Sequence, residues 1–136
     1  MKFEFIELNN KQVRDIEQKL EIYDSHYIKE RLFGDVNVGV LYEGKLIAGA
    51  SACISAFRIL YVSTVYVNEE FRNKGVGRML MKKVEETATS LGINIIRLDT
   101  FNWQGAGFYV KLGYEQVGHY KSNVDDFEEY FFLKRL

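Results

Sequence analysis

A glycine-containing turn between a strand pattern and a helix pattern is the feature that most constrains the fold of this chain. The turn reads Arg72-Asn73-Lys74-Gly75-Val76-Gly77. Residues 59–67 before it are mostly Ile, Leu, Tyr, Val and Thr, which is strand composition. Residues 76–91 after it carry apolar side chains at helical spacing, and Gly92 is a suitable C-cap. Because residues 93–100 are again apolar, the order predicts two parallel strands joined by a helix.

The chemistry of this turn favours a bound anion. Glycine lets the backbone approach a ligand closely, and the first N–H groups of a helix carry the positive end of its dipole. Arg72, Lys74 and Arg78 add positive charge. The turn is not a P-loop, since no Gly-Lys-Ser/Thr ending follows, and Leu80 stands where a dinucleotide fingerprint has its third glycine. A purely structural link between strand and helix stays open.

Composition narrows the class of protein. The length of 136 residues predicts a single domain over residues 1–136. A net charge of −1 argues against a dedicated nucleic-acid binder. An alternative function is nucleic-acid binding through the basic residues of the turn and helix, and it predicts an affinity for DNA that falls steeply as salt concentration rises. These basic residues are Arg72, Lys74, Arg78, Lys82 and Lys83. One cysteine, Cys53, and no apolar run of about 18 residues lead us to expect a cytoplasmic protein without a membrane partner.

Periodicity over the rest of the chain predicts a mixed α/β (α+β) domain. The expected order is β-α-α-β-β-β-α-β-α-β-β. The elements outside residues 59–100 are a strand over 3–8, a helical region over 11–33, strands over 38–42 and 46–57, a helix over 103–112, and strands over 114–120 and 129–134.

Two sequence blocks carry a family resemblance. The turn has the pattern Arg, two residues, Gly, one residue, Gly, and it follows Val65-Tyr66-Val67. The second block is Asn102 followed by Gly107-Phe108-Tyr109-Val110-Lys111-Leu112-Gly113-Tyr114. Together, and in this order, they resemble the GNAT superfamily of N-acetyltransferases, and residues 98–104 and 130–136 resemble small bacterial members. Asn68, in place of a frequent proline, and Gly107, in place of proline or an acidic residue, depart from the pattern.

The resemblance implies a fold and a cosubstrate. The expected fold is a central mixed, mostly antiparallel sheet whose parallel fourth and fifth strands splay apart, and the expected cosubstrate is acetyl-CoA. Main-chain amides of the turn would hold the pyrophosphate, and the pantetheine arm would pair with backbone at the end of the fourth strand. The implied cofactor-binding residues are Val65, Tyr66, Val67, Arg72, Asn73, Lys74, Gly75, Val76, Gly77, Arg78, Asn102, Phe108, Tyr109 and Lys111. Asn102 has a second interpretation as the N-cap of the helix that follows.

The resemblance also places Tyr109 as the general acid that protonates the leaving thiolate. A phenol with a reference pKa of about 10 suits that task, although Phe108 and Tyr109 also fit an aromatic core. The general base is less defined, since residues 59–67 contain no carboxylate. Asp99 is the tentative base, and a turn-bonding role for it stays open. The other options are Ser63 or Thr64 acting through a water, His26 and His119.

These expectations combine into one function and one alternative. The function is direct acetyl transfer, in a ternary complex, to a primary amine of a small molecule or peptide, with no metal and with a homodimer expected from family precedent. The region over residues 11–33, the third and fourth strands, and the late hairpin would set acceptor preference. The alternative is a non-catalytic acyl-CoA-binding regulatory or interaction module.

Overall fold

The computed structural model covers residues 1–136, which form two compact units, Met1–Arg31 and Leu32–Leu136. The first unit contains helix α1 (Asn10–Asp24), which begins with a capping box. Asn9 Oδ1 accepts from the Gln12 backbone N–H at 2.9 Å, and Gln12 Oε1 accepts from the Asn9 backbone N–H at 3.0 Å. The helix therefore has a well-defined start, although none of its residues is buried.

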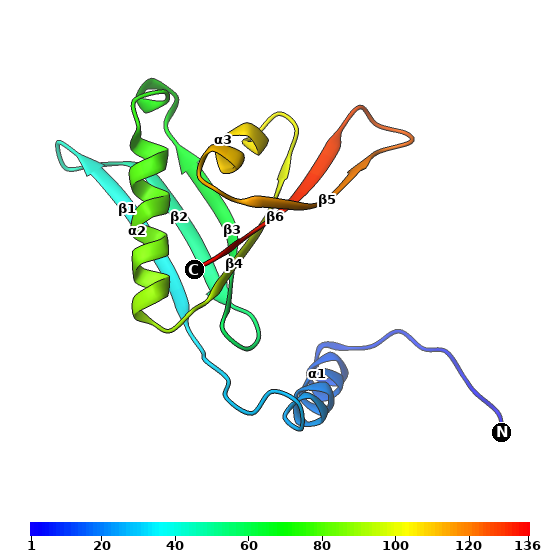
Figure 1. Cartoon of the computed structure of the whole chain (residues 1–136). Helices are drawn as coiled ribbons and strands as arrows, with labels where there is room; N and C mark the ends of the chain where they lie inside the picture. Colours follow the sequence, from blue (N-terminus) through cyan, green and yellow to red (C-terminus); the bar gives the residue numbers. More distant parts are fainter. The chain divides into compact units, whose positions relative to one another are not determined.

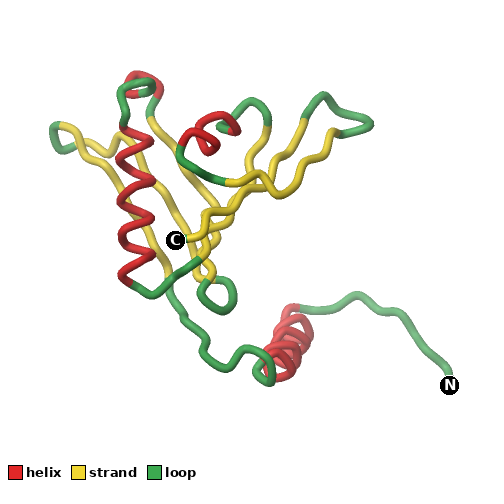
Figure 2. Tube along the Cα trace, viewed as in Figure 1, coloured by secondary structure: helices red, strands yellow, loops and turns green.

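The second unit contains a six-stranded sheet in the order β1-β2-β3-β4-β6-β5 (Figures 1 and 2). All neighbouring strands are antiparallel except the parallel pair β3 and β4. The strands are β1 (Asp35–Tyr42), β2 (Lys45–Ile54), β3 (Ile59–Val67), β4 (Ile95–Phe101), β5 (Glu115–Lys121) and β6 (Glu128–Arg135). The helices are the 3₁₀ turn η1 (Glu69–Phe71), α2 (Val76–Ser90) and α3 (Ala106–Lys111). No helix of the chain combines the length and the apolar character needed to span a bilayer.

The predicted fold class is confirmed, and three details differ. Residues 3–8 form no strand, the helical region expected over 11–33 is one helix that ends at Asp24, and the helix expected over 103–112 begins only at Ala106. Alternating side chains are a local pattern, whereas a strand needs a hydrogen-bonded partner, and the sheet pairs no strand with residues 3–8. The strands expected as fourth and fifth are therefore β3 and β4.

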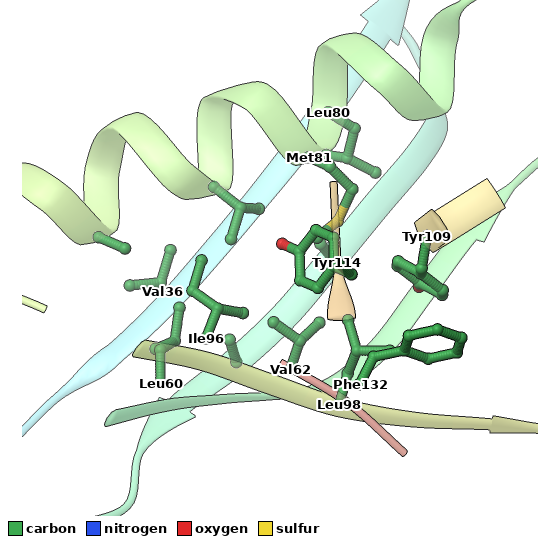
Figure 3. Packing of buried hydrophobic residues seen from close by; sticks show 14 of the residues in the cluster. Val36, Leu60, Val62, Leu80, Met81, Ile96, Leu98, Tyr109, Tyr114 and Phe132 are labelled. Carbon is green, nitrogen blue, oxygen red and sulfur yellow. The ribbon is translucent and has the colours of Figure 1, made fainter. Parts of the chain in front are cut away.

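The core of the second unit lies between α2 and one face of the sheet. The buried stripe of α2 meets β1, β2 and β3, and Figure 3 shows Leu80 and Met81 above Val62 and Ile96. Five side chains are completely inaccessible: Leu60, Met81, Val84, Ala88 and Ile96. Burial of each of the larger side chains among these stabilises the folded state by about 1.5–3 kcal/mol. This packing fixes the start of α2 beside the end of β3.

A partly buried ion pair joins α2 to β6 and gives a testable stability effect. Lys134 Nζ lies 2.8 Å from Glu85 Oε1 and donates to the Leu112 carbonyl at 2.8 Å. Because Lys134→Met removes the ion-pair partner of Glu85 and the donor to the Leu112 carbonyl, we expect a loss of about 1–3 kcal/mol in the free energy of unfolding. Urea denaturation measures it, with Lys82→Met on the exposed face of α2 as the control. Equal stability of the two variants would contradict a structural role for this pair.

Candidate active site

A gap between β3 and β4 creates the site. The two strands pair only at Ile59 with Ile95, Leu60 with Ile96 and Tyr61 with Arg97. Beyond Tyr61 they diverge, as Figure 1 shows, while β3 continues to Val67 and β4 to Phe101. The edge of β3 that faces the gap therefore carries backbone groups that no strand satisfies.

The hydrogen bonds at the end of β3 show which backbone groups face this gap. The Asn68 N–H donates to the Ile47 carbonyl at 2.8 Å, toward β2. Since backbone groups alternate in direction along a strand, those of Val65 and Val67 face the gap. Consistent with this, Arg72 Nε donates to the Val67 carbonyl at 2.9 Å. The end of β3 thus offers backbone donors and acceptors to an extended ligand.

The start of α2 supplies donors for an anion. Gly75 has a left-handed φ of 81°, and no side chain caps the helix. The first intrahelical bond runs from the Met79 N–H to the Gly75 carbonyl at 3.1 Å. The preceding N–H groups of Val76, Gly77 and Arg78 therefore have no acceptor within the helix. Such a helix N-terminus favours a phosphate electrostatically and by hydrogen bonding.

A glycine at position 77 lets this turn lie against α3. A Cβ atom at Gly77 would lie 3.1 Å from Phe108 Cζ and 3.7 Å from a methyl carbon of Val67. A side chain at this point would therefore need the Phe108 ring to shift by a few tenths of an ångström. The second glycine of the turn thus has a packing role as well as a place beside the anion site.

One cavity of about 770 Å³ connects the start of α2 with the gap between β3 and β4. Its lining contains most of the residues that the sequence predicts for the site. These are Val65, Tyr66, Val67, Arg72, Asn73, Gly75, Val76, Gly77, Arg78, Asp99, Phe108, Tyr109 and Lys111, together with the alternative bases Ser63 and Thr64. The volume is in the range of small-molecule sites, so the cavity is large enough for an extended ligand.

Two predicted cofactor residues lie outside this lining. Lys74 Nζ donates to the Glu70 carbonyl at 2.9 Å. Asn102 Oδ1 accepts from the Glu128 backbone N–H at 2.9 Å, which ties the end of β4 to β6. The N-cap interpretation of Asn102 is wrong, since α3 begins after Gly105. Cofactor contacts by Lys74 and Asn102 stay predictions without support from this geometry.

Tyr109 is a buried phenol in the cavity wall. Its side chain is 7% exposed, and its ring lies 5.1 Å from Phe108, 5.5 Å from Tyr114 and 6.0 Å from Phe132, between centroids. Burial raises the pKa of Tyr109 to about 12. The phenol is therefore protonated at neutral pH, as a general acid must be. It is also a weaker acid than the reference pKa of about 10 suggests, so proton transfer to a thiolate is less favourable than sequence reasoning assumed.

Asp99 lines the same cavity and has a tyrosine partner. Tyr61 Oη donates to Asp99 Oδ2 at 2.9 Å. This hydrogen bond is the main reason that the pKa of Tyr61 is raised. The Arg97 guanidinium carbon lies 4.5 Å from the centre of the Tyr61 ring. Asp99 thus keeps Oδ1 available to a ligand.

Of the two histidines, His119 does not belong to this wall. His119 stacks on Tyr130 with 4.6 Å between ring centroids, and its Nε2 lies 3.4 Å from Glu128 Oε1. It is not part of the cavity lining. His26 belongs to the first unit, where its Nδ1 lies 3.1 Å from the Tyr23 carbonyl oxygen. The geometry of His119 does not support a role as the base, and a role for His26 stays a prediction.

Sequence reasoning missed two polar residues of the lining, Thr100 and Gln104. Gln104 Oε1 accepts from the Phe101 backbone N–H at 2.8 Å, and Thr100 Oγ1 accepts from the Gly105 N–H at 3.2 Å. These bonds shape the connection from β4 to α3. The only local signal for these two residues is that Gln104 stands three positions after Phe101, a spacing that allows a side-chain-to-backbone hydrogen bond.

Comparisons with known proteins agree with this arrangement. The model of the acetyltransferase (GNAT) family matches residues 4–114. An uncharacterized N-acetyltransferase of Chlorobaculum tepidum is 32% identical over 76 residues, which cover 56% of this chain and 47% of that protein. A crystal structure of an acetyltransferase from Bacillus cereus aligns with a TM-score of 0.90 at 26% identity, over 98% of both chains. PaiA N-acetyltransferase from Thermoplasma acidophilum, solved with coenzyme A, shares the fold at a TM-score of 0.61 and 19% identity, over 95% of this chain and 80% of that one.

The second unit is thus an α/β domain, in which a mixed sheet has one splayed parallel pair and an uncapped helix begins at the mouth of the gap. The chain belongs to the acetyltransferase (GNAT) family, as its sequence predicts. It spans less than half the length of the Chlorobaculum tepidum relative that it matches.

Proposed function

We propose that residues 1–136 act as one N-acetyltransferase domain that transfers an acetyl group from acetyl-CoA directly to a primary amine in a ternary complex. The acceptor belongs to a small molecule or a peptide. One observation carries the proposal: a single cavity joins the free amides of α2 to the gap where Asp99 and Tyr109 lie. Family membership supports the same reaction.

The residues of the cavity fit acetyl-CoA from one end to the other. The N–H groups of Val76, Gly77 and Arg78 bind the pyrophosphate, and the Arg72 and Arg78 guanidinium groups add charge. The backbone of Val65 and Val67 pairs with the pantetheine arm. In this assignment acetyl-CoA supplies the activated acyl group, and the protein supplies position and proton transfer.

The proposed chemistry needs one proton donor and one proton acceptor. An alkyl ammonium with a reference pKa of about 10.4 must lose a proton before it can attack, and Asp99 accepts it. The amine nitrogen then bonds to the thioester carbon, the carbon–sulfur bond breaks, and the thiolate takes the proton of Tyr109. The nitrogen loses its second proton as it becomes an amide, and this proton restores the Tyr109 phenol. Two further proposals come from the sequence. The single cysteine, Cys53, suits a cytoplasmic protein. Family precedent suggests a homodimer.

Acetyl-CoA titration of a matched pair of variants tests the cosubstrate assignment. Gly77→Glu and Gly77→Gln add side chains of similar size beside Phe108, and only the glutamate adds a negative charge next to the pyrophosphate. We expect the wild-type protein to bind acetyl-CoA in the micromolar range. Gly77→Glu should bind at least about tenfold more weakly than Gly77→Gln, because like charges repel at short range.

Titration calorimetry measures these affinities, and circular dichroism checks that each variant is folded. Equal weakening of both variants would mean that volume, not charge, matters at this position. No binding by the wild-type protein would overturn the proposed function.

A further inference from the structure

The strand register places a second carboxylate near Asp99. In the antiparallel pair of β4 and β6, Asp99 lies opposite Phe131, and Phe101 lies opposite Glu129. Residues two apart along a strand share a face, so all four side chains lie on one face. Asp99 and Glu129 are diagonal neighbours across this pair, at a typical separation of about 7–8 Å.

Each of these carboxylates is only partly satisfied. Tyr61 Oη donates to Asp99 Oδ2 at 2.9 Å, and Tyr120 Oη donates to Glu129 Oε1 at 2.6 Å. Asp99 and Glu129 form no ion pair with a lysine or arginine. Asp99 Oδ1 and Glu129 Oε2 therefore remain available as acceptors for a cationic ligand.

The two negative charges act across one surface. The pKa of Tyr120 is raised mainly by its hydrogen bond to Glu129, and Asp99 also contributes. Reciprocally, the pKa of Tyr61 is raised mainly by Asp99, with a contribution from Glu129 and an opposing one from Arg97. Arg97 lies over the Tyr61 ring, where its positive charge opposes the effect of the two carboxylates. The surface around the two carboxylates thus keeps an excess of negative charge.

An aromatic surface connects the cavity to Glu129. Trp103 lines the cavity, is 65% exposed, and stacks on Phe101 with 4.8 Å between centroids. Phe101 lies directly across the strand pair from Glu129. The Phe127 ring packs edge-on against the Phe101 ring, with 5.6 Å between centroids. Aromatic faces attract cations and pack against methylene groups. This surface suits an alkyl chain that ends in a positive charge.

We propose that the acceptor is a short alkyl diamine, whose reacting amine lies beside Asp99 and whose second ammonium group is bound by Glu129. The inference rests on the proposed function, since it places the reacting amine in the acetyl-CoA cavity. The typical spacing of diagonal strand positions, about 7–8 Å, is comparable with the span of such a diamine. Glu129 is therefore a specificity-determining residue, and the aromatic surface carries the methylene chain.

A comparison of diaminobutane with butylamine tests this directly. Wild-type protein should acetylate the diamine with a kcat/KM at least about tenfold higher, because a hydrogen bond between charged groups is among the stronger polar contacts. Glu129→Gln should raise KM for diaminobutane by about tenfold, leave its kcat nearly unchanged, and leave butylamine unaffected. Thiol release from acetyl-CoA follows both reactions.

Glu128→Gln is the matched control. The Glu128 side chain lies on the opposite face, where it accepts from Tyr130 Oη at 3.1 Å and neighbours His119. It should leave the preference for the diamine unchanged. No preference in the wild-type protein, or the same preference in Glu129→Gln, would overturn the inference.

Calorimetric titration of diaminobutane separates failure of this inference from failure of the proposed function. Tighter binding by the wild-type protein than by Glu129→Gln, with CoA present or absent, supports the diamine site even if no amine is acetylated. Equal binding by both proteins counts against the site, whereas absence of acetyl-CoA binding counts against the proposed function alone.

Discussion

Tyr109→Phe is expected to lower kcat by about 10²–10⁴-fold, the usual contribution of a general acid. The variant removes the hydroxyl and keeps the ring that packs against Phe108, Tyr114 and Phe132. Affinity for acetyl-CoA should therefore change by less than about threefold, since no hydroxyl contact to the pyrophosphate site is lost. Steady-state rates with acetyl-CoA and an amine acceptor, together with a binding titration, measure the two effects.

The raised pKa of Tyr109 also predicts a pH dependence. Burial shifts it upward to about 12, so the phenol keeps its proton at every pH below that value. Loss of this proton should cause no decline in kcat between pH 7 and about pH 11. A descending limb centred near pH 10 that disappears in Tyr109→Phe would mean that the phenol is more solvated than the structure indicates.

Tyr114→Phe is the control for Tyr109→Phe. Tyr114 is a buried neighbour that does not line the cavity, so kcat should stay close to the wild-type value. A kcat for Tyr109→Phe within about threefold of wild type would contradict the assignment of the general acid. If both proteins bind acetyl-CoA and neither releases thiol with a mixed set of amines, the acyl-CoA-binding module becomes the better interpretation.

Phe132→Ala should destabilise the protein by about 3–5 kcal/mol, the usual cost of emptying a buried aromatic position. Phe132 is 1% exposed and is among the largest fully buried side chains. It lies on β6 opposite Leu98, and its ring is 6.0 Å from that of Tyr109. The cavity left behind would open beside Tyr109, the proposed general acid. Tm should fall by roughly 10–20 °C, as thermal denaturation followed by circular dichroism would show.

The neighbouring residue provides the control for this loss. Phe131 is 37% exposed and faces the other side of the sheet, next to Tyr120. Phe131→Ala should cost about 1 kcal/mol, since partly exposed positions lose less on truncation. Equal costs for the two variants would mean that the core does not lie where this structure places it.

The local sequence pattern was sufficient to predict the central part of the fold. The strand predicted over residues 59–67 is β3, with the same bounds, and the helix predicted after the turn is α2. Here strand composition, a left-handed glycine and helical periodicity follow one another directly along the chain, so each signal is interpreted without knowledge of distant residues. The family was likewise recognisable, because its two blocks lie in contiguous sequence.

Other features were decided only by tertiary structure. The alternation of residues 3–8 predicts a strand, but strand formation depends on a partner that a local pattern cannot supply. Lys74 and Asn102 bond to nearby backbone instead of lining the cavity. The pKa of Tyr109 depends on burial by rings from separate elements.

The relation between Asp99 and Glu129 is the clearest example of this division. The two residues are thirty positions apart in the sequence, and nothing in their local surroundings connects them. The register of β4 against β6 brings them onto one face. Sequence alone determined the family, the turn and the order of the central elements, because those follow from short-range periodicity. Strand pairing and burial decided which side chains meet in the cavity, because both depend on contacts between distant segments.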